Sequence, residues 1–316
     1  MAAKTTLTGA AWLAFALLVP AAERTFELNG RIIPEVQGSV SLFGATSPFS
    51  VSKLTDTDGR FRFTRLISGQ YTVSAFSPGY GERRTTVDIG PSTAGEKGRL
   101  DLTLSLERDT NIAAGAMVNA ADLAIPDSAR RQYAEAQKRL AARDVPSAIE
   151  RLERAVKIAP AFSGAWNNLG TISYQTRQYP QAETYFRRSL EANPAAYEPL
   201  VNLGGVLLTL GKVEEAYQFN LYSVLKRPAD ALANSQLGMN YFALGKLNLA
   251  EKYLDEARRL DPAHFSHPQL LLAEVYLRRG DKAKAVETLE EFLRYHPDAE
   301  NAQRIRDGIE KLKARD

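Results

Sequence analysis

The feature that most restricts how this chain can fold is a spacing of 34 residues that repeats through its C-terminal part. Pro160, Pro194, Pro228 and Pro262 follow one another at this step, and Pro297 comes 35 residues later. The same step separates Ala148, Ala182, Ala216 and Ala250, and also the pairs Leu169-Gly170, Leu203-Gly204 and Leu237-Gly238. Three landmarks that stay in phase predict a tandem array of one structural unit, in which each unit packs only on its neighbours.

The unit from 163 to 196 shows the pattern most completely. Trp166, Leu169 and Gly170 fall at helical spacing in its first half, and Ala182 and Phe186 do so in its second half. This arrangement resembles the tetratricopeptide repeat, whose unit has 34 residues. The resemblance implies antiparallel helix pairs stacked into a right-handed α-superhelical solenoid over residues 128–297. The five repeats are expected at 129–162, 163–196, 197–230, 231–264 and 266–298.

The small residues of the pattern indicate close packing. Gly170 and Ala182 have little bulk, so the two helices of a unit can approach each other, while Trp166 and Phe186 fill the space toward the next unit. We therefore interpret Trp166 as a core residue in preference to an exposed ligand-binding residue. The last unit needs a solvated outer face, and residues 298–316, with apolar side chains at helical spacing, are predicted to form a capping helix.

Residues 24–107 follow a different period. Apolar and polar residues alternate in Arg60–Phe63, Gln70–Ala75 and Leu100–Leu104, which places alternate side chains on opposite faces of a strand. Clusters of Gly, Pro, Asp and Ser separate such stretches, so we expect about seven strands in an N-terminal β-sandwich. The chain is thus predicted to be multidomain, first all-β and then all-α.

The segment from Thr55 to Tyr80 links this region to a known family. It contains Asp56-x-Asp58-Gly59, Phe61, Phe63, Leu66, Gly69-x-Tyr71-x-Val73 and Gly79-Tyr80. It resembles the carboxypeptidase regulatory-like domain, a transthyretin-like β-sandwich, and the resemblance implies a fold more than an activity. Asp58-Gly59 is also a hairpin-turn signal. A calcium loop is the alternative, although the later glutamate ligand of such a loop is missing.

Composition and motifs exclude several kinds of site. The chain has no cysteine, which rules out disulfides, thiolate metal sites and cysteine nucleophiles, and its net charge of +3 gives no broad attraction for nucleic acid. Its three histidines are His264, His267 and His296, and the pair His264-x-x-His267 lacks an evident third metal ligand. No phosphate-binding loop, Gly-x-Ser-x-Gly or His-Glu-x-x-His motif occurs. We expect no catalytic residue, metal or cofactor, and no enzyme activity.

Two further segments concern export and the link between the domains. Residues 1–21 combine a positive charge near the start, an apolar run of ten residues at 10–19 and small residues at the expected cleavage point. The run is too short to span a bilayer, so we interpret 1–21 as a cleaved signal peptide, with an uncleaved anchor as the alternative. The mature protein, without a membrane span, is then expected in the periplasm or outside the cell. Residues 108–127 are predicted to be a linker, with Ser128 as the N-cap of the first helix.

By resemblance to the tetratricopeptide family, the first helix of each unit lines a concave groove. The predicted groove residues are Asn167, Thr171 and Tyr174 from the second repeat, Val201, Asn202 and Leu208 from the third, Ser235, Met239 and Phe242 from the fourth, and Leu270 and Glu274 from the fifth. These positions are mostly neutral, which argues against the cationic clamp that some family members use for a peptide carboxylate. They predict an apolar groove with amide donors, or a set that is partly packed inside the fold.

The sequence therefore predicts an exported scaffold that holds a protein or peptide partner in this groove. The alternative is a carbohydrate- or cell-envelope-binding protein that acts through the sandwich. That function requires an exposed aromatic patch, for which Tyr71, Phe76 and Tyr80 are the candidates.

Overall fold

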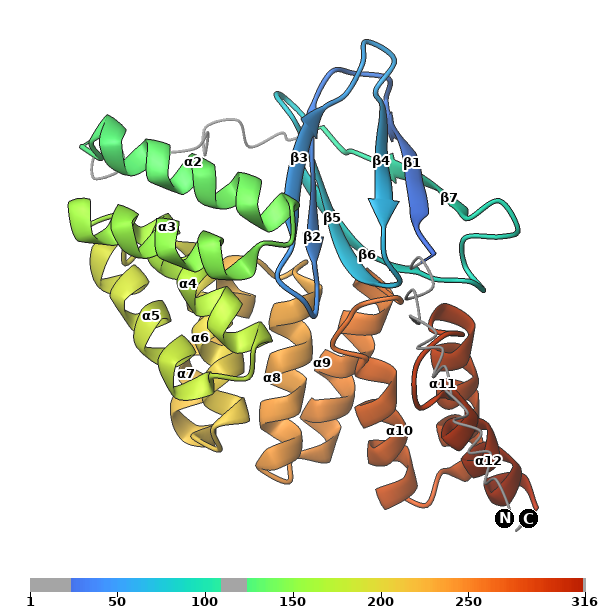
Figure 1. Cartoon of the computed structure of the whole chain (residues 1–316). Coiled ribbons are helices and arrows are strands. Elements are labelled where there is room, and N and C mark those ends of the chain that lie inside the picture. The colour runs from blue at the N-terminus through green and yellow to red at the C-terminus, as the bar shows by residue number, and fades with distance from the viewer. Residues whose placement is uncertain (1–23, 109–123, 315–316) are drawn as a thin grey trace, which may run out of the picture.

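The computed structural model describes residues 24–108 and 124–314, in which a β-sandwich is followed by a stack of antiparallel helices (Figure 1). The predicted multidomain fold class, all-β and then all-α, is confirmed. The predicted signal peptide at 1–21 and most of the predicted linker at 108–127 lie outside the described residues. No helix within the two described ranges is both long enough and apolar enough to cross a membrane.

The sandwich consists of two sheets. One has the strand order β4-β1-β7, with β1 antiparallel to β4 and parallel to β7, and the other has the antiparallel order β3-β2-β5-β6. The strands are β1 (Phe26–Ile33), β2 (Ser39–Gly44), β3 (Ser50–Leu54), β4 (Arg60–Leu66), β5 (Gly69–Ser77), β6 (Gly81–Ile89) and β7 (Arg99–Ser105). The strands β3 and β6 are therefore the two edges of the four-stranded sheet.

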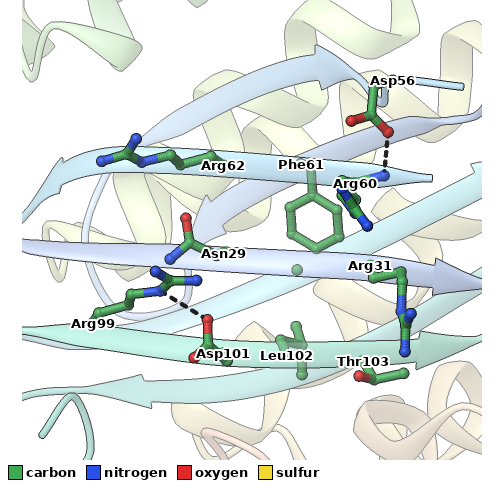
Figure 2. A pocket seen from close by; sticks show the side chains of 11 residues that line it. Asn29, Arg31, Asp56, Arg60, Phe61, Arg62, Arg99, Asp101, Leu102 and Thr103 are labelled. Carbon is green, nitrogen blue, oxygen red and sulfur yellow. Dashed lines mark hydrogen bonds and ion pairs between the residues drawn. The ribbon is translucent and has the colours of Figure 1, made fainter. Parts of the chain in front are cut away.

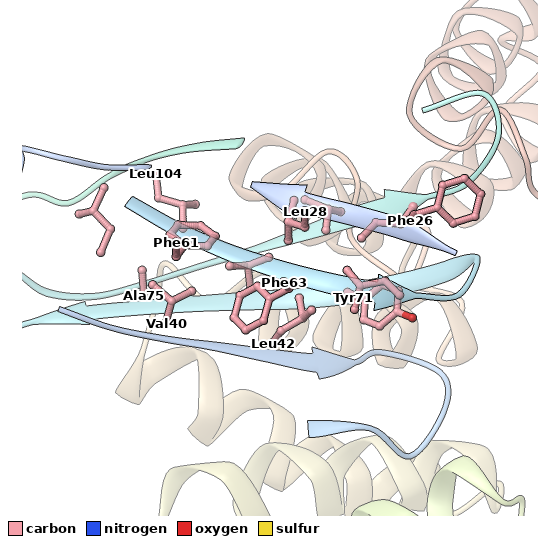
Figure 3. Close-up of a cluster of buried hydrophobic side chains, with 14 of the residues drawn as sticks. Phe26, Leu28, Val40, Leu42, Phe61, Phe63, Tyr71, Ala75 and Leu104 are labelled. Atoms are coloured by element: carbon pink, nitrogen blue, oxygen red, sulfur yellow. The ribbon is translucent and has the colours of Figure 1, made fainter. Parts of the chain in front are cut away.

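The core of the sandwich lies between the inner faces of these sheets (Figure 3). Tyr71, Val73 and Ala75 of β5 are buried there, as their alternation with polar residues predicts, and so are Phe61 and Phe63 of β4. Burial of these apolar side chains is the main source of the stability of the sandwich.

The Asp-Gly turn does not form the predicted hairpin. Strand β3 ends at Leu54 in the four-stranded sheet, whereas β4 begins at Arg60 in the three-stranded sheet, so the turn carries the chain from one sheet to the other. The Asp56 carboxylate accepts hydrogen bonds from the N–H groups of Asp58 (3.1 Å) and Arg60 (2.7 Å), and Gly59 has a φ of 72°. The side chain of Asp56 thus satisfies backbone donors within the turn itself, and the same residues can serve a crossover as well as a hairpin.

Five antiparallel helix pairs form the repeat array, and one further helix follows them. The pairs are α2 (Asp127–Ala141) with α3 (Val145–Ile158), α4 (Ser163–Gln175) with α5 (Tyr179–Ala192), α6 (Tyr197–Thr209) with α7 (Val213–Lys226), α8 (Ala231–Ala243) with α9 (Leu247–Leu260), and α10 (Pro268–Arg278) with α11 (Lys282–Tyr295). Helix α12 (Ala302–Lys313) packs on α11 and buries Ala302 and Ile309.

The first helix starts two residues earlier than predicted, and Ser128 is not its N-cap. Helix α2 begins at Asp127 and its N-cap is Pro126, whose carbonyl accepts from the N–H groups of Ala129 and Arg130. Proline lacks an N–H and has its φ fixed near the helical value, so it can precede a helix without leaving an unpaired donor.

Glycines in the first helices allow close approach of the second helices. In the second repeat, a Cβ added at Gly170 would lie 2.5 Å from the ring of Phe186, which is 1% exposed. In the third repeat, Asn220 takes the place of the aromatic residue, and a Cβ at Gly204 would lie 1.9 Å from its Oδ1. The close helix packing that the small residues predict is therefore present, with two different side chains facing the glycine.

Trp166 lies at the border of this core. It packs against the buried cluster of the first two repeats but is itself only partly buried. Its indole N–H donates to the carbonyl of Pro160 at 2.9 Å, and its ring centroid lies 5.7 Å from that of Tyr185. Trp166 therefore has a packing role, but Phe186 occupies the more deeply buried position.

We expect Gly170→Ala to destabilise the array by about 1–3 kcal/mol, because the new methyl group would overlap the buried ring of Phe186. Gly164→Ala in the same helix is the matched control, since its added Cβ would lie 3.6 Å from the ring of Phe162, an ordinary van der Waals contact. There the better helix propensity of alanine should stabilise the array by roughly 0.5–1 kcal/mol. Urea unfolding of both variants measures the difference, and equal effects at the two positions would contradict the packing described above.

The sandwich is docked on the repeat array through its four-stranded sheet (Figure 1). At one end β3 lies beside α2, and Arg143, in the turn after α2, donates to the hydroxyl of Tyr71 at 3.0 Å. At the other end the carboxylate of Asp261, which follows α9, accepts from the N–H of Thr86 at 2.9 Å. Because β6 is an edge strand, Asp261 satisfies a backbone donor that no neighbouring strand pairs.

Further polar contacts fix the sandwich along the array. The guanidinium of Arg84 lies 3.1 Å from Glu198 at the start of α6, and Gln175 at the end of α4 donates to the carbonyl of Gly44 at 2.9 Å. The N–H of Ser92 donates to Asp298 in the turn after α11, also at 2.9 Å. These contacts extend from the second repeat to the turn after α11. The position of the sandwich therefore determines which part of the concave face of the array the sandwich covers.

Candidate partner-binding groove

Part of the predicted groove presents a strip of exposed and half-buried apolar side chains on neighbouring helices. Tyr174, Met239 and Leu277 lie toward the C-terminal ends of α4, α8 and α10 and are 39%, 36% and 36% exposed. Leu208 and Phe242 are half-buried toward the same ends of α6 and α8. Since α4 contacts α6, α6 contacts α8, and α8 contacts α10, these five residues lie on neighbouring helices. We call this strip the open groove.

Nearer the N-terminal ends of the same helices, two predicted groove residues are buried. Val201 is 5% exposed and Ser235 is 0% exposed, so the prediction that they face a partner is wrong for this arrangement. Val201 packs in a cluster with Ala233 of the next first helix, and the hydroxyl of Ser235 accepts from that of Ser266 at 2.8 Å. The following repeat therefore covers both side chains.

The amide residues predicted to bind a peptide backbone are engaged with each other. The side-chain nitrogen of Asn202 donates to Oδ1 of Asn167 at 3.1 Å, and the hydroxyl of Thr171 donates to the backbone carbonyl of Asn167 at 3.0 Å. All three residues are half-buried. A partner that uses these groups must compete with the bonds already present.

The fifth repeat brings charge to the border of the open groove. Glu274 accepts from the guanidinium of Arg278 at 2.9 Å, and that guanidinium also lies 4.3 Å from the ring centroid of Phe242. Leu270, also predicted here, is half-buried. Arg278 was not among the predicted groove residues, although its place one residue after Leu277 puts it on the same turn of α10. The open groove is thus apolar with one exposed ion pair at its side.

The sandwich forms one wall of the groove at the first two repeats. A cleft of about 670 Å³ lies between the β2–β3 hairpin and the helices α2 and α4. Phe43, Phe49 and Val51 line it from the sandwich, and Tyr133 and Thr171 line it from the helices. Thr171, which was predicted to face a partner, therefore faces a cleft that both domains share.

A second hollow, of about 560 Å³, lies on the three-stranded sheet (Figure 2). Arginine side chains dominate its lining, and each is paired with a carboxylate. The pairs are Arg31 with Glu35, Arg60 with Asp58, Arg62 with Glu27 and Arg99 with Asp101. The ring of Phe61 is 6% exposed and offers no stacking surface. The hollow is therefore polar and close to charge-balanced.

The three aromatic residues named for the carbohydrate alternative do not form an exposed patch. Tyr71 is 2% exposed, Tyr80 packs against the core of the sandwich, and only Phe76, at 47%, is exposed. Phe76 belongs to the four-stranded sheet, which is the sheet that faces the repeat array. A flat aromatic platform for sugar rings is therefore not formed by these residues.

The histidines and the acidic turn have structural partners. His267 and His296 have ring centroids 4.6 Å apart beneath the sandwich, and the carboxylate of Asp56 is used by its own turn. In residues 24–108 and 124–314, no three His, Cys, Asp or Glu side chains are placed to hold a metal ion together. Burial is the main cause that lowers the pKa of His267 to about 4.

Sequence patterns did not identify the docking residues. Arg84, Asp261 and Asp298 are single polar residues whose partners lie more than 100 positions away in the chain. One signal was present, because Asp261 directly precedes Pro262 and Asp298 directly follows Pro297, two of the prolines that mark the turns between repeats. Polar residues in these turns point away from the helix pairs and are free to bind another domain.

Comparison with known families matches both domains. Residues 26–105 match the carboxypeptidase regulatory-like domain. Residues 133–196, 174–231 and 241–307 match the tetratricopeptide repeat.

Individual relatives match part of this chain over part of their own length. The human Protein O-mannosyl-transferase TMTC3 is 31% identical over 149 residues, which cover 46% of this chain and 16% of that protein. Anaphase-promoting complex subunit 3 of Schizosaccharomyces pombe is 26% identical over 160 residues, covering 50% of this chain and 24% of that protein. This chain therefore spans only a small part of these two relatives. The solved structure of PilW, a type IV pilus biogenesis factor, has a TM-score of 0.53 and 20% identity, covers 60% of this chain and 87% of PilW, and shows a shared fold alone.

Proposed function

We propose that this chain, which carries a carboxypeptidase regulatory-like domain followed by tetratricopeptide repeats, is an exported, non-enzymatic scaffold that binds a protein or peptide partner in the open groove. Tetratricopeptide repeats are interaction modules, so a scaffold is the function that the repeat array supports. Export, to the periplasm or beyond the cell, rests on the character of residues 1–21.

One observation carries the choice of site. Apolar side chains that are exposed or half-buried recur toward the C-terminal ends of four successive first helices, whereas Val201 and Ser235 on two of these helices are buried. Neighbouring exposed apolar residues on a concave surface are typical of an interaction site, whereas single exposed apolar residues are scattered over most protein surfaces. An amphipathic helix or an extended segment with apolar residues at regular spacing would fit such a strip.

We expect Tyr174→Ala combined with Met239→Asp to weaken partner binding at least tenfold, with little effect on folding, because both side chains are more than one-third exposed. The partner is first trapped by a photo-crosslinking amino acid in place of Met239 in producing cells, and its affinity for both forms is then measured by calorimetry. The matched control is Tyr222→Ala with Leu225→Asp, on the second helix α7, where the side chains are 49% and 69% exposed. Equal loss with both pairs, or a crosslink from position 225 alone, would contradict the open groove as the site.

Carbohydrate or envelope binding through the sandwich is the second candidate, and the polar hollow of Figure 2 is the observation that favours it. Arginine, aspartate and asparagine side chains around that hollow supply the donors and acceptors that sugar hydroxyls need. Retention of the whole chain on insoluble cell-wall glycan, lost in Arg60→Ala with Arg62→Ala and kept in Tyr174→Ala with Met239→Asp, would support this second function instead of the first.

A further inference from the structure

All three histidines of the chain gather at one place, between the sandwich and the last two repeats. His264 and His267 lie in the turn between α9 and α10, and His296 directly follows α11. His264 is 5% exposed and His296 is 0% exposed. The rings of His267 and His296 have centroids 4.6 Å apart and meet nearly edge to face. We call these residues the histidine cluster.

The sandwich contacts this cluster through one amide and one carboxylate. The side-chain nitrogen of Gln70 lies 2.8 Å from Nε2 of His267 and 3.2 Å from Nδ1 of His296. Asp88, which pairs with Gln70 across β5 and β6, has a carboxylate oxygen 3.4 Å from the same Nδ1 of His296. The contact therefore joins residues that are about two hundred positions apart in the sequence.

Two hydrogen bonds at the cluster require an unprotonated ring nitrogen. An amide nitrogen can only donate, so Nε2 of His267 acts as an acceptor toward Gln70. Nδ1 of His296 lies between the Gln70 amide and the Asp88 carboxylate, so its tautomer decides which of the two it bonds. Nδ1 of His264 likewise accepts from the backbone N–H of Ser266 at 3.2 Å. A protonated imidazole has no acceptor, so protonation of Nε2 of His267 or of Nδ1 of His264 removes the bond described here.

We propose that the histidine cluster is a pH-sensitive latch, which in its neutral form holds the sandwich against the last two repeats and on acidification releases it. Release of the sandwich separates Gln70 and Asp88 from the array and lets water reach the histidine rings. It also removes the sandwich from the start of α6 and from the turn before α10. The latch does not depend on the proposed function, because docking can be measured without any partner.

The other charged groups around the cluster have opposing effects on proton uptake and docking. Asp88 raises the pKa of His267, while the charge of His296 lowers it. Asp261, bonded to the strand edge, has its pKa raised by burial, so it takes up a proton more readily in the docked state and opposes release on acidification. Asp298 is bonded to Ser92, and the Glu291 carboxylate near Gln269 is paired with Arg258. Asp88 is thus the one carboxylate placed to compensate a charged ring directly.

Burial is the largest of these effects, and it favours the neutral form of the imidazole rings. It is the main cause that lowers the pKa of His264 to about 3 and that of His267 to about 4, both below the usual value for histidine. Of these two residues, His267 is the one bonded to Gln70 of the sandwich. A histidine whose pKa is lower in the docked state binds fewer protons there than in the released state. Docking is therefore fully favoured above about pH 6.5 and weakens as the pH falls toward 4. Each histidine that becomes exposed weakens docking by about tenfold per pH unit within this window.

The latch can be tested on the full chain with two spin labels. The chain has no cysteine, so Lys97→Cys in the sandwich and Arg304→Cys in α12, both exposed, give one defined pair of labels. Pulsed dipolar spectroscopy should show one narrow distance at pH 7.5 and an added longer, broad population at pH 5, with unchanged far-UV circular dichroism and full return at pH 7.5. A narrow distance that persists down to pH 4.5 would overturn the proposal.

Two variants separate the latch from general acid effects. His267→Gln with His296→Gln keeps hydrogen-bonding groups but cannot take up a proton, so the distance should become independent of pH between 7.5 and 5. If that pair fails to fold, His267→Gln can be tested alone. It should remove at most the contribution of one histidine to the pH dependence, which is about a tenfold change in the docking equilibrium per pH unit. Arg84→Gln is the control, because it removes the ion pair with Glu198 and should weaken docking at every pH while the pH dependence remains. Release at the same pH in the histidine variants would show that other groups control docking.

Discussion

The Phe186→Ala substitution is expected to lower the free energy of unfolding of the repeat array by about 3–5 kcal/mol. Phe186 is 1% exposed and packs in a cluster with Leu203, Val206 and Leu207 of the next repeat. Its ring also lies over Gly170, where α4 has no side chain to fill the space that alanine would leave. The cavity can close only if α4 and α5 move, and such a movement would disturb the packing of the third repeat on the second.

Urea unfolding followed by far-UV circular dichroism measures this loss, and Trp166→Ala is the informative control. Trp166 is a larger aromatic residue of the same repeat, but it is only partly buried, so its loss should cost less, on the order of 1–3 kcal/mol. If Trp166→Ala proves as costly as Phe186→Ala, then our assignment of the core of the second repeat is wrong.

These two residues show which properties the sequence could predict. The 34-residue period identifies the positions that face a neighbouring helix, because each unit of a repeat array makes the same local contacts. Gly170 and Phe186 therefore meet as the spacing predicts. The period cannot give the depth of burial of Trp166, since this depends on how far Tyr185 and the adjacent turn cover the indole ring.

The alternation in the sandwich was equally predictive, but the path of the chain between the sheets was not. Phe61, Phe63 and Tyr71 are buried as expected, because strand side chains alternate strictly between two faces. The turn at Asp56 carries the same local signal whether the next strand pairs with the previous one or joins the other sheet. Local turn chemistry fixes the geometry of the turn, whereas the packing of the whole sandwich decides which sheet receives β4.

Docking between the domains was the largest feature that the sequence did not reveal. It depends on matches between distant residues, such as Asp261 with the edge of β6 and Gln70 with two histidines, and no periodic pattern encodes such matches. Docking also explains part of the difference between the predicted and the observed groove. Thr171 faces a cleft shared with the sandwich, and Glu198, at the start of α6, is bound by Arg84. The groove must therefore be considered as a property of both domains.

The Phe63→Ala substitution is expected to destabilise the sandwich by about 3–5 kcal/mol and, through docking, to lower the stability of the repeat array as well. Phe63 is 1% exposed in the centre of the sandwich core and lies near Phe61, with ring centroids 5.9 Å apart. A sandwich of about 80 residues has a small core, so a loss of this size is a large part of its total stability. An unfolded sandwich cannot present Gln70 and Asp88 to the histidine cluster, so the array loses the contacts that docking supplies.

The two consequences can be measured separately in one protein. In a chain that starts at Arg24, Trp166 is the only tryptophan, so its fluorescence reports unfolding of the array, while far-UV circular dichroism reports both domains. Phe76→Ala is the matched control, because Phe76 belongs to the same sandwich but is 47% exposed, and its loss should cost less than about 1 kcal/mol. In Phe63→Ala the Trp166 transition should move to lower urea concentration, because a domain that binds only the folded array stabilises it. An unchanged Trp166 transition alongside an unfolded sandwich would mean that the contacts of Asp261, Arg84 and Gln70 contribute nothing to the array, and it would remove the physical basis for a groove built by both domains.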